Sequence, residues 1–546
     1  MEMWSAGLAK HDFKHDWWKT GIIYEIYLRS FQDSSGDGIG DLNGVIQRLD
    51  YLSWLGVDAI WISPFYPSPM ADFGYDISDY RGVEPVFGTL ADVDRLIAAA
   101  HDRQLKVILD FVPNHTSDRH PWFQQSRASR LSSKRDWYIW RDPGPAGGPP
   151  NNWISQFGGP AWTFDRATGQ YYLHSFLREQ PDLNWRNSAV REAMFDVLKF
   201  WLERGIDGFR VDVLWLLIKD EDMRDNPANL AYQPTQPDIH RTLSVYNSDR
   251  PEIHALITQL RAVLDQYPDR VLIGEIYLPV ERLVAYYGDS LSGVQLPFNF
   301  ALIHAAWNAK AIAALIAEYE QLLPTDGWPN WVLGNHDQPR IAARVGAAQA
   351  RIAAMLLLTL RGTPTMYYGD EIGMPRVEVP PEVARDPWGK NEPGLGVGRD
   401  PSRTPMQWDD RANAGFSSVR PWLPIEACYG ERNVARLTRD PQSILTLYHR
   451  LIELRRAHRV LQVGDARAIS AEDDVLTYER VKDDQRIIVM LNLSSEPRPL
   501  PASQRENTRE NTHVLLSTYM DRKGSCGPSE LRANEGIVVA MRPATR

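Results

Sequence analysis

Short apolar runs recur along most of the chain and alternate with longer segments of helical periodicity. Eight such runs are predicted as strands: Ile22–Leu28, Ala59–Ser63, Lys106–Val112, Asp207–Val213, Val271–Tyr277, Val294–Phe300, Asn330–Asn335 and Thr363–Tyr368. Helical patterns between them include Leu42–Leu55, Leu90–Gln104, Ser188–Arg204 and Glu252–Gln266. Strands that alternate with helices indicate a parallel sheet, and eight is the number that closes a barrel. The predicted fold class is therefore α/β, a (β/α)8 TIM barrel.

Three connections are longer than a barrel needs. His115–Asp182 follows the third run and is rich in Gly, Pro, Trp and Asn, Lys219–Arg250 follows the fourth, and Met374–Gln407 follows the eighth. Connections of this length are usually subdomains or lids. They leave the carboxyl ends of the strands, where barrel enzymes place their active sites. We expect them to wall a pocket there.

The alternation of strands and helices ends after Arg455. Short strands between polar turns are predicted instead, at Arg467–Ser470, Val475–Val481, Arg486–Leu493, His513–Tyr519 and Gly536–Met541. They indicate a small antiparallel β-sandwich at the C-terminus. The expected domains are the barrel over residues 1–114 and 183–460, an insertion subdomain B over 115–182, and the sandwich over 461–546.

Composition excludes several classes of partner. The 546 residues carry 60 Lys and Arg against 70 Asp and Glu, a net charge of -10. Nucleic acids and anionic membranes attract basic surfaces, so we expect neither as a partner. The 19 Trp, 22 Tyr and 16 Phe residues are more than packing usually requires. Aromatic platforms bind flat apolar ligand faces, which makes this excess a first indication of the ligand.

Cellular location is predicted from what the chain lacks. Cys428 and Cys526 are the only cysteines, too few for a disulfide framework or a structural zinc site. The N-terminal segment has no basic start followed by an apolar stretch, as a signal peptide would. The most apolar run, Ala353–Leu360, is shorter than the roughly 18–20 residues that span a bilayer. We expect a cytoplasmic protein, monomeric or a homodimer.

The segment DSSGDGIGD resembles a calcium-binding loop. Alternating oxygen-bearing residues and a glycine at the sixth position let a chain fold around a hard cation. The twelfth position is Gly44, so the bidentate Glu of an EF-hand is missing. We expect a structural Ca²⁺ or Mg²⁺, and the alternative is an Asp/Gly-rich turn without metal. The candidate ligands are Asp33, Ser35, Asp37, Ile39 and Asp41.

Charged and imidazole side chains stand at the ends of four predicted strands. The third ends in DFVPNH, the fourth in GFRVD, the fifth in GE and the seventh in NHD. Charges in strands this apolar are unfavourable unless they are paired or functional. Arg210 and Asp212 are two residues apart on one strand, so they point to the same side. The other candidates are Asp110, Asn114, His115, Glu275, His336 and Asp337.

Paired carboxylates on adjacent strands suit the cleavage of glycosidic bonds. One carboxylate attacks the anomeric carbon and the other donates a proton to the leaving oxygen. A neighbouring arginine keeps the nucleophile ionised, and burial raises the pKa of the acid. One alternative is a set of structural ion pairs at the barrel rim. A second is a metal hydrolase that uses His115 and His336, although the chain has no HxH or HExxH motif.

Several motifs in the same order resemble the α-amylase superfamily, glycoside hydrolase family 13. DFVPNH, GFRVD, GE, NHD, QPDLN and GTPTMYYGDEIG carry the resemblance, which covers essentially the whole chain. DSSGDGIGD, MADFGYDISDY and GRDPSRTPMQWDD are most similar to the bacterial exo-acting α-glucosidases of the oligo-1,6-glucosidase type. Relatives often carry Asn at the third position of the metal loop, where this chain has Ser35.

The resemblance implies a role for each matching residue. Asp212 would be the nucleophile, Glu275 the general acid/base, and Asp337 the third acid that holds sugar hydroxyls. Asp72 and an arginine of GRDPSRTP would bind the non-reducing end and make the enzyme exo-acting. We favour Arg403 over Arg399 for that role, and the sequence alone leaves both open. The remaining residues expected around the −1 sugar are Tyr75, His115, Phe157, Phe176, Arg210 and His336. Trp153 and Trp162 lie in the same insertion and are either sugar platforms or packing.

The implied activity is retaining hydrolysis of terminal, non-reducing α-glucosyl residues from small α-glucosides, without a catalytic cofactor. Val213 follows the nucleophile, where relatives that prefer α-1,6 bonds also carry Val, so we favour isomaltose-like bonds. Retention requires the Asp212 and Glu275 carboxyl groups to lie about 5–5.5 Å apart. The alternatives are a transglucosylase or a trehalose synthase-like isomerase with the same site. From another class, a non-catalytic transporter-associated barrel would have lost its acids.

Overall fold

The computed structural model describes residues 16–501 and 512–541. Residues 1–15, where we expect no signal peptide, lie outside the described residues. Eight parallel strands form one sheet in the order β10-β11-β1-β2-β3-β7-β8-β9. A parallel bridge between Asn299 and Trp331 joins the two ends and closes the barrel. The strands are β1 (Ile23–Ile26), β2 (Ala59–Ile62), β3 (Lys106–Phe111), β7 (Gly208–Val211), β8 (Val271–Gly274), β9 (Leu296–Pro297), β10 (Asn330–Val332) and β11 (Thr363–Tyr367). The predicted barrel is confirmed, and each strand lies within its predicted run.

Helices surround the barrel, and polar caps set where several of them begin. Asp41 accepts the Gly44 N–H at the start of α2, and Thr89 and Asp92 form a capping box at the start of α3. The prediction for α3 runs two residues too far, because Gln104 has a φ of 61° and cannot continue a helix. The longer helices are α2 (Leu42–Leu55), α3 (Leu90–Asp102), α5 (Ser188–Glu203), α6 (Ile253–Leu264), α9 (Ala309–Leu322), α10 (Ile341–Thr359) and α13 (Ile444–Ala457). The shorter ones are α1 (Trp17–Thr20), α4 (Pro121–Ala128), α7 (Val280–Leu283), α8 (Ala301–His304), α11 (Pro387–Asn391), α12 (Val434–Leu437) and α14 (Arg459–Val463).

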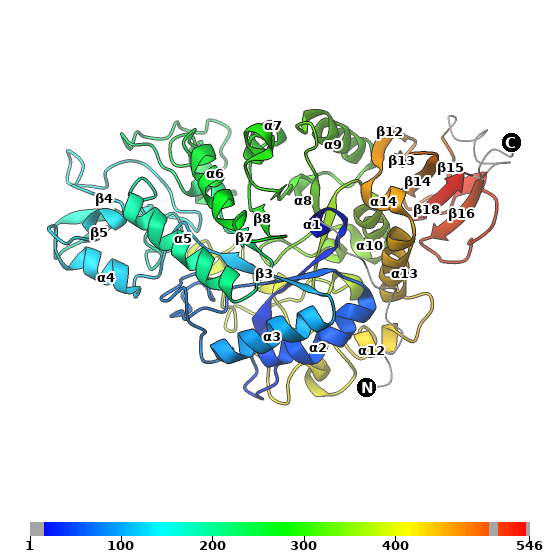
Figure 1. Cartoon of the computed structure of the whole chain (residues 1–546), viewed down its shortest axis with the longest axis horizontal. Coiled ribbons are helices and arrows are strands. Elements are labelled where there is room, and N and C mark those ends of the chain that lie inside the picture. Colours follow the sequence, from blue (N-terminus) through cyan, green and yellow to red (C-terminus); the bar gives the residue numbers. More distant parts are fainter. Residues whose placement is uncertain (1–15, 502–511, 542–546) are drawn as a thin grey trace.

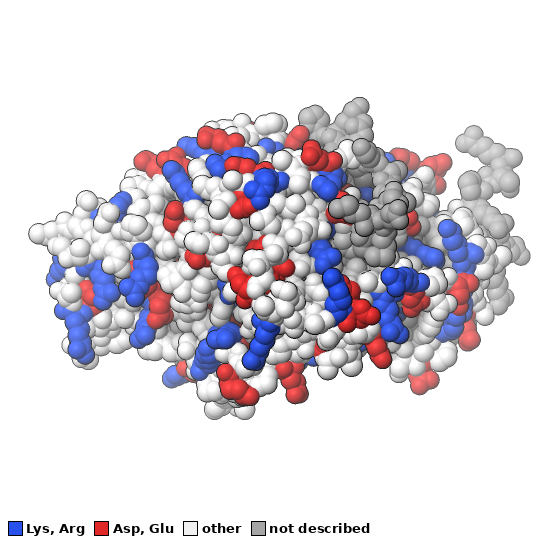
Figure 2. Space-filling view, turned by 90° about the horizontal axis from the view of Figure 1, so that it is seen from below, with Lys and Arg blue, Asp and Glu red and all other residues white. Residues whose placement is uncertain are grey.

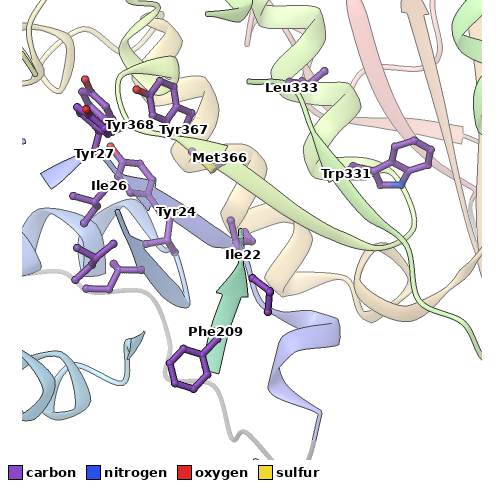
Figure 3. Close-up of a cluster of buried hydrophobic side chains, with 14 of the residues drawn as sticks. Ile22, Tyr24, Ile26, Tyr27, Phe209, Trp331, Leu333, Met366, Tyr367 and Tyr368 are labelled. Carbon is purple, nitrogen blue, oxygen red and sulfur yellow. The ribbon is translucent and has the colours of Figure 1, made fainter. Parts of the chain in front are cut away.

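Strand alternation divides the core into two layers. Ile23, Trp61, Ile108 and Ile273 point into the barrel and pack together there. Alternate residues of the same strands point outward against the helices and belong to a larger cluster. Figure 3 shows part of that outer layer, with aromatic rings from β1, from β11 and from the residues that directly follow them. The barrel interior is therefore a packed core, and inward polar residues lie at its carboxyl end.

Helix α10 is the one described helix that is long and apolar enough to cross a membrane by length and composition alone. Within the fold, 61% of its apolar window is buried, and it packs against α13 and the C-terminal sheet. Core helices of water-soluble proteins pass the same test. The apolar run considered in the sequence is the most buried part of this core helix.

The insertion after β3 has a small sheet and a core of its own. Its strands are β4 (Trp140–Arg141), β5 (Trp162–Asp165) and β6 (Gln170–Leu173), in the order β4-β6-β5. The rings of Trp153 and Trp162 lie 6.2 Å apart and are both buried in this core, together with Ile139 and Leu173. Of the two alternatives for these tryptophans, packing is correct. The insertion is drawn in cyan at the left of Figure 1.

The C-terminal part is antiparallel and lies at the opposite end of the molecule (Figure 1). Its five-stranded sheet has the order β12-β13-β14-β18-β16, and a two-stranded sheet pairs β15 with β17. Leu500 and Leu531, at the small sheet, pack with Ile488 and Val539 of the large one. The strands are β12 (Asp465–Glu472), β13 (Val475–Lys482), β14 (Gln485–Asn492), β15 (Arg498–Pro499), β16 (Thr512–Ser517), β17 (Glu530–Leu531) and β18 (Gly536–Met541). On the face shown in Figure 2, acidic and basic side chains are interspersed.

Candidate active site

The barrel strands open at their carboxyl ends into a cavity of about 320 Å³. Residues that follow β2, β3, β7, β8 and β10 form its floor. The three long connections supply its walls, as Phe157, His240 and Trp388 illustrate. The predicted site residues that line the cavity are Asp72, Tyr75, His115, Phe157, Phe176, Asp212, Val213, Glu275, His336, Asp337 and Arg399.

Arg210 joins three carboxylates at the cavity floor. Its Nη1 donates to Asp212 Oδ1 at 2.7 Å and to Asp110 Oδ1 at 2.8 Å. Its Nη2 lies 2.8 Å from Glu275 Oε2. The sequence paired Arg210 with Asp212 alone, and the barrel register adds the other two carboxylates. One guanidinium therefore lies between the two candidate catalytic carboxylates and holds both in fixed positions.

Val213 has a left-handed backbone, with φ 40° and ψ 45°. This conformation is unfavourable for a β-branched residue, and such strain of about 1–3 kcal/mol is typical of functional sites. The Val213 N–H donates to Glu275 Oε2 at 2.8 Å. The strained turn thus directs a backbone donor at the carboxylate and brings the Val213 side chain to the cavity wall.

Burial dominates the protonation of the two carboxylates. It raises the pKa of Glu275 to about 7, against the opposing effect of Arg210. It also raises the pKa of Asp212 well above its usual value, again opposed by Arg210. One guanidinium cannot stabilise both anions in a buried site, so the pair shares a proton near neutral pH. Asp212 accepts a hydrogen bond from Arg210, which favours its ionised form, and we place the proton on Glu275.

Asp337 has the opposite environment. Its Oδ1 accepts hydrogen bonds from Arg403 Nη2 at 2.8 Å and from Arg399 Nη1 at 3.1 Å. Although burial alone would raise the pKa of Asp337, the charges of Arg399 and Arg403 bring it well below its usual value. Asp337 is therefore a permanent anion on the cavity wall, suited to accept hydrogen bonds from sugar hydroxyl groups.

The arginine beside Asp72 is Arg399. Its Nη2 donates to Asp72 Oδ1 at 2.7 Å, and Asp386 holds the same guanidinium through two further bonds at 2.8 and 2.6 Å. Arg403 lies behind the wall, where its Nε donates to the His336 carbonyl. Of the two arginines left open by the sequence, Arg399, and not the favoured Arg403, is therefore the one that lines the cavity beside Asp72. The two arginines are four residues apart in an irregular loop, so spacing alone does not show which side chain reaches the cavity.

Three more of the predicted residues, all aromatic, lie near the Asp72–Arg399 ion pair and Asp110. Tyr75 donates to Asp110 Oδ2 at 3.0 Å, and its ring stacks on His336 with centroids 5.3 Å apart. The Phe157 and Phe176 rings pack edge to face at 5.3 Å, and the Arg399 guanidinium lies 4.6 Å from the Phe157 ring. These aromatic faces and the ion pairs beside them form one continuous wall.

His115 is held uncharged in the same wall. Its Nε2 lies 3.1 Å from both the Tyr75 carbonyl and the Gln180 amide. Burial lowers the pKa of His115 to about 4, so the ring is neutral at physiological pH. Gln180 also reaches Asp72 Oδ2 at 3.3 Å, which links the insertion to the Asp72 end of the cavity.

Sequence reasoning missed several residues of the cavity. Gln180 belongs to the motif QPDLN and could have been found there. The others stand in long connections or after short strands, where no periodicity marks them. Those that line the cavity are Gln156, Trp215, Ile239, His240, Tyr277, His304, Gln338 and Trp388.

The candidate metal ligands are bonded by backbone N–H groups of their own loop, and the Asp33 and Asp41 carboxylates both approach the Ser35 N–H. The Asp33 carboxylate accepts the N–H groups of Gly36 and Gly38, and Asp41 caps α2 through the Gly44 N–H. Asp37 Oδ1 accepts from the Ile39 N–H. Among residues 16–501 and 512–541, no group of three or more His, Cys, Asp or Glu side chains could hold a metal ion. As folded, the carboxylates of the loop accept hydrogen bonds from the loop's own backbone N–H groups.

The fold and the site define a barrel protein with buried paired carboxylates in a deep, aromatic-walled pocket. Residues 25–464 match the family description "Alpha amylase, catalytic domain". The chain belongs to this family.

Similar proteins match over nearly their whole length. A probable alpha-glucosidase of Rhizobium meliloti (strain 1021) is 41% identical over 93% of this chain and 94% of its own. An oligo-1,6-glucosidase of Parageobacillus thermoglucosidasius is 39% identical over 96% of this chain and 99% of its own. The crystal structure of the alpha-glucosyl transfer enzyme XgtA superposes with a TM-score of 0.90 and 39% identity, covering 96% of this chain and 99% of that one.

Proposed function

We propose that this protein is a retaining, exo-acting α-glucosidase that removes terminal non-reducing glucose from short α-glucosides. The observation that carries the proposal is the Arg210 cluster, which places Asp212 and Glu275 on one guanidinium at the floor of the cavity. Glycosidic cleavage with retention needs one ionised and one protonated carboxyl group, and burial provides the shared proton. The relatives named alpha-glucosidase and oligo-1,6-glucosidase support the same activity.

In the first step Asp212 attacks the anomeric carbon while Glu275 donates its proton to the leaving oxygen. The Asp212–glucosyl bond forms as the glycosidic bond breaks, and the aglycone departs with the proton. Arg210 holds both groups, and the Val213 N–H stabilises Glu275 once it is ionised. In the second step Glu275 takes a proton from water, which attacks the glucosyl carbon and releases Asp212. A carboxyl separation of about 5–5.5 Å stays a prediction of this mechanism.

Exo action follows from the charged cluster at the Asp72 end of the cavity. Asp72, Arg399 and Asp386 are buried and tied together by hydrogen bonds. They offer charged partners to the hydroxyl groups of a terminal glucose, which would hold the non-reducing end of the substrate at this part of the cavity. Asp337 adds an acceptor beside them.

Transfer of glucose to another sugar is the second candidate function. The same covalent intermediate gives a transglucosylase, or a trehalose synthase-like isomerase, when a sugar hydroxyl reaches it before water. The likeness to an alpha-glucosyl transfer enzyme favours this possibility. A non-catalytic transporter-associated role is disfavoured, because Asp212, Glu275 and Asp337 all face the cavity.

Linkage preference rests on Val213, which lines the cavity directly beside the nucleophile. A branched apolar side chain here narrows the space for the leaving sugar, and we favour α-1,6 over α-1,4 bonds. Such contacts discriminate by about 1–3 kcal/mol. A structural Ca²⁺ or Mg²⁺ stays a prediction of the loop sequence, and the mechanism uses no metal.

A cytoplasmic location is supported by Cys428 and Cys526, which are exposed and unpaired thiols, as expected in a reducing compartment. Neutral α-glucosides need no electrostatic attraction, which fits the net charge of -10. The chain is expected to act as a monomer or homodimer, without nucleic acid or membrane partners.

Product analysis over time tests the function directly. Purified protein is incubated with maltose, isomaltose, sucrose, trehalose and dextrin, and the anomer released first is read by proton NMR. We expect α-glucose from the short substrates and little from dextrin. Release of β-glucose, or of oligosaccharides from dextrin, would contradict the proposal, and glucosylated products at high maltose would favour transfer.

A further inference from the structure

Glu25 is a carboxyl group that the mechanism above does not use. It lies in β1, within the apolar run IIYEIYL, and is fully buried. It points into the barrel on the same side as Ile23, toward the carboxyl end, where the cavity begins. Its Oε1 lies 2.6 Å from His336 Nδ1, and its Oε2 has no hydrogen-bond partner.

His336 connects Glu25 to the sugar pocket. Its ring is sandwiched between Tyr27 and Tyr75, with centroids at 5.6 and 5.3 Å and nearly parallel planes. Its Nε2 faces the cavity, 2.8 Å from the Tyr75 hydroxyl and 3.3 Å from Asp337 Oδ2. What this nitrogen can offer a ligand depends on where the ring carries its hydrogen.

The Tyr75 hydroxyl has one hydrogen and two polar neighbours, His336 Nε2 and Asp110 Oδ2. The charge state of Asp110 decides which of them receives the hydrogen. Asp110 Oδ2 lies 3.0 Å away and also accepts from the Trp61 indole at 3.3 Å. The other oxygen of Asp110 accepts from Arg210. Burial raises the pKa of Asp110, but both of its oxygens face groups that donate and Arg210 opposes the rise, so we take Asp110 as an ionised acceptor of the Tyr75 hydrogen.

The hydrogen of the Tyr75–His336 contact must then come from His336 Nε2. Burial lowers the pKa of His336, and although Asp337 favours a doubly protonated ring, burial together with the nearby Arg403, Arg210 and Arg399 outweighs it, so Nδ1 carries no hydrogen. An uncharged Nδ1 is an acceptor. Its partner at 2.6 Å, Glu25 Oε1, must be the donor.

We propose that Glu25 is an uncharged, protonated carboxyl group that donates to His336 Nδ1 and so fixes His336 as a hydrogen donor at Nε2, toward the sugar. Glu25 is a positioning residue that acts through His336, and its effect on catalysis rests on the proposed function. With a fixed Nε2–H, His336 donates to the Tyr75 oxygen, at the edge of the ring that faces Asp337 and the cavity.

The groups around Glu25 agree with an uncharged state. Asp337 after β10 and Asp110 on β3 are anions that disfavour a further negative charge on Glu25, while Arg210 on β7 and a hydrogen bond from the His336 backbone favour it. The paired positions on β2 and β11 are Trp61 and Tyr367, which carry no charge at neutral pH. Burial outweighs Arg210 and raises the pKa of Glu25 well above its usual value. An unpartnered Oε2 is also less unfavourable on a neutral carboxyl than on a carboxylate.

Two substitutions test the proposal. Glu25→Gln keeps a donor, because its amide N–H can replace the carboxyl hydrogen, and we expect kcat and KM within about threefold of the unmodified enzyme. Glu25→Met keeps the volume but has no donor, and leaves the buried Nδ1 unpaired. Here we expect kcat/KM to fall roughly tenfold or more. A large loss with Glu25→Gln would mean that Glu25 acts as an anion, and would overturn the proposal.

Nitrogen NMR reads the hydrogen on His336 without any activity. The signals are assigned by their loss in His336→Asn, and we expect a protonated Nε2 and a bare Nδ1 in both the unmodified protein and Glu25→Gln. A hydrogen on Nδ1 in the unmodified protein would overturn the proposal, even in a fully active enzyme. If the protein had no α-glucosidase activity, the proposed function would fail and this measurement would still decide the state of Glu25.

Discussion

Replacing Arg210 by Met removes the charge at the centre of the cluster and nearly keeps the volume. Arg210 is fully buried and contacts three carboxylates. Breaking a buried ion pair by removing one partner is destabilising by about 3–5 kcal/mol. In a chain of this size a loss of 1 kcal/mol in the free energy of unfolding lowers the melting temperature by about 2 °C or less. We therefore expect the melting temperature of the variant to be roughly 5–10 °C lower at pH 8. Activity should be lost.

The loss should depend on pH in a defined direction. Without Arg210, the folded-state pKa values of Asp110, Asp212 and Glu275 rise further, because Arg210 lowers each of them. A carboxyl group whose pKa is higher in the folded than in the unfolded state stabilises the folded protein at a pH below its unfolded-state pKa. As the pH rises through its folded-state pKa, this stabilisation is lost. The carboxyl groups are neutral in acid, so Arg210→Met should be much closer to the unmodified protein at pH 5 than at pH 8.

Arg455→Met is the matched control. Arg455 is also buried, but its guanidinium donates to the carbonyls of Leu358, Leu360 and Gly362 and to no carboxylate. Melting is followed by calorimetry at pH 5, 6, 7 and 8 for both variants. We expect a steep pH dependence for Arg210→Met and a nearly constant deficit for Arg455→Met. The same deficit at pH 5 and pH 8 in Arg210→Met would refute the account of the cluster.

Three further predictions concern the acid Glu275, the Asp72 end of the cavity and the candidate calcium-binding loop. The value of kcat/KM should fall above about pH 7, because Glu275 loses the proton that it donates to the leaving oxygen. An aryl glucoside with a good leaving group needs this proton less and should show a weaker decline. Equal declines for the two substrates would argue against Glu275 as the acid. Asp72→Ala removes a charged group that contacts Arg399 and would contact the sugar, so kcat/KM for disaccharides should fall about 10–100-fold. Glucose release measures this change. A fall of less than threefold would mean that the terminal glucose binds elsewhere. A chelator should lower the melting temperature by several degrees, because it removes the structural ion that the loop sequence predicts. An unchanged melting temperature would show that the backbone N–H groups bonded to Asp33 and Asp41 close the loop without an ion.

Local patterns were sufficient for the architecture. Apolar runs of strand length separated by helical periodicity predicted all eight barrel strands, because burial on both faces of a parallel strand leaves a continuous apolar stretch. The carboxyl ends of these strands meet at one rim, so Asp212, Glu275 and Asp337 could be placed together before any contact was known.

What the sequence alone determined is therefore the barrel, its added domains and the acids at its rim, since each follows from order and periodicity along the chain. Only the tertiary structure decided which groups touch. It placed Arg399 rather than Arg403 beside Asp72, and it brought Arg210 to Glu275 as well as to Asp212. It also turned Glu25, hidden in an apolar strand, toward His336. Such contacts depend on register between strands and on loop conformation, and no spacing along the chain encodes either.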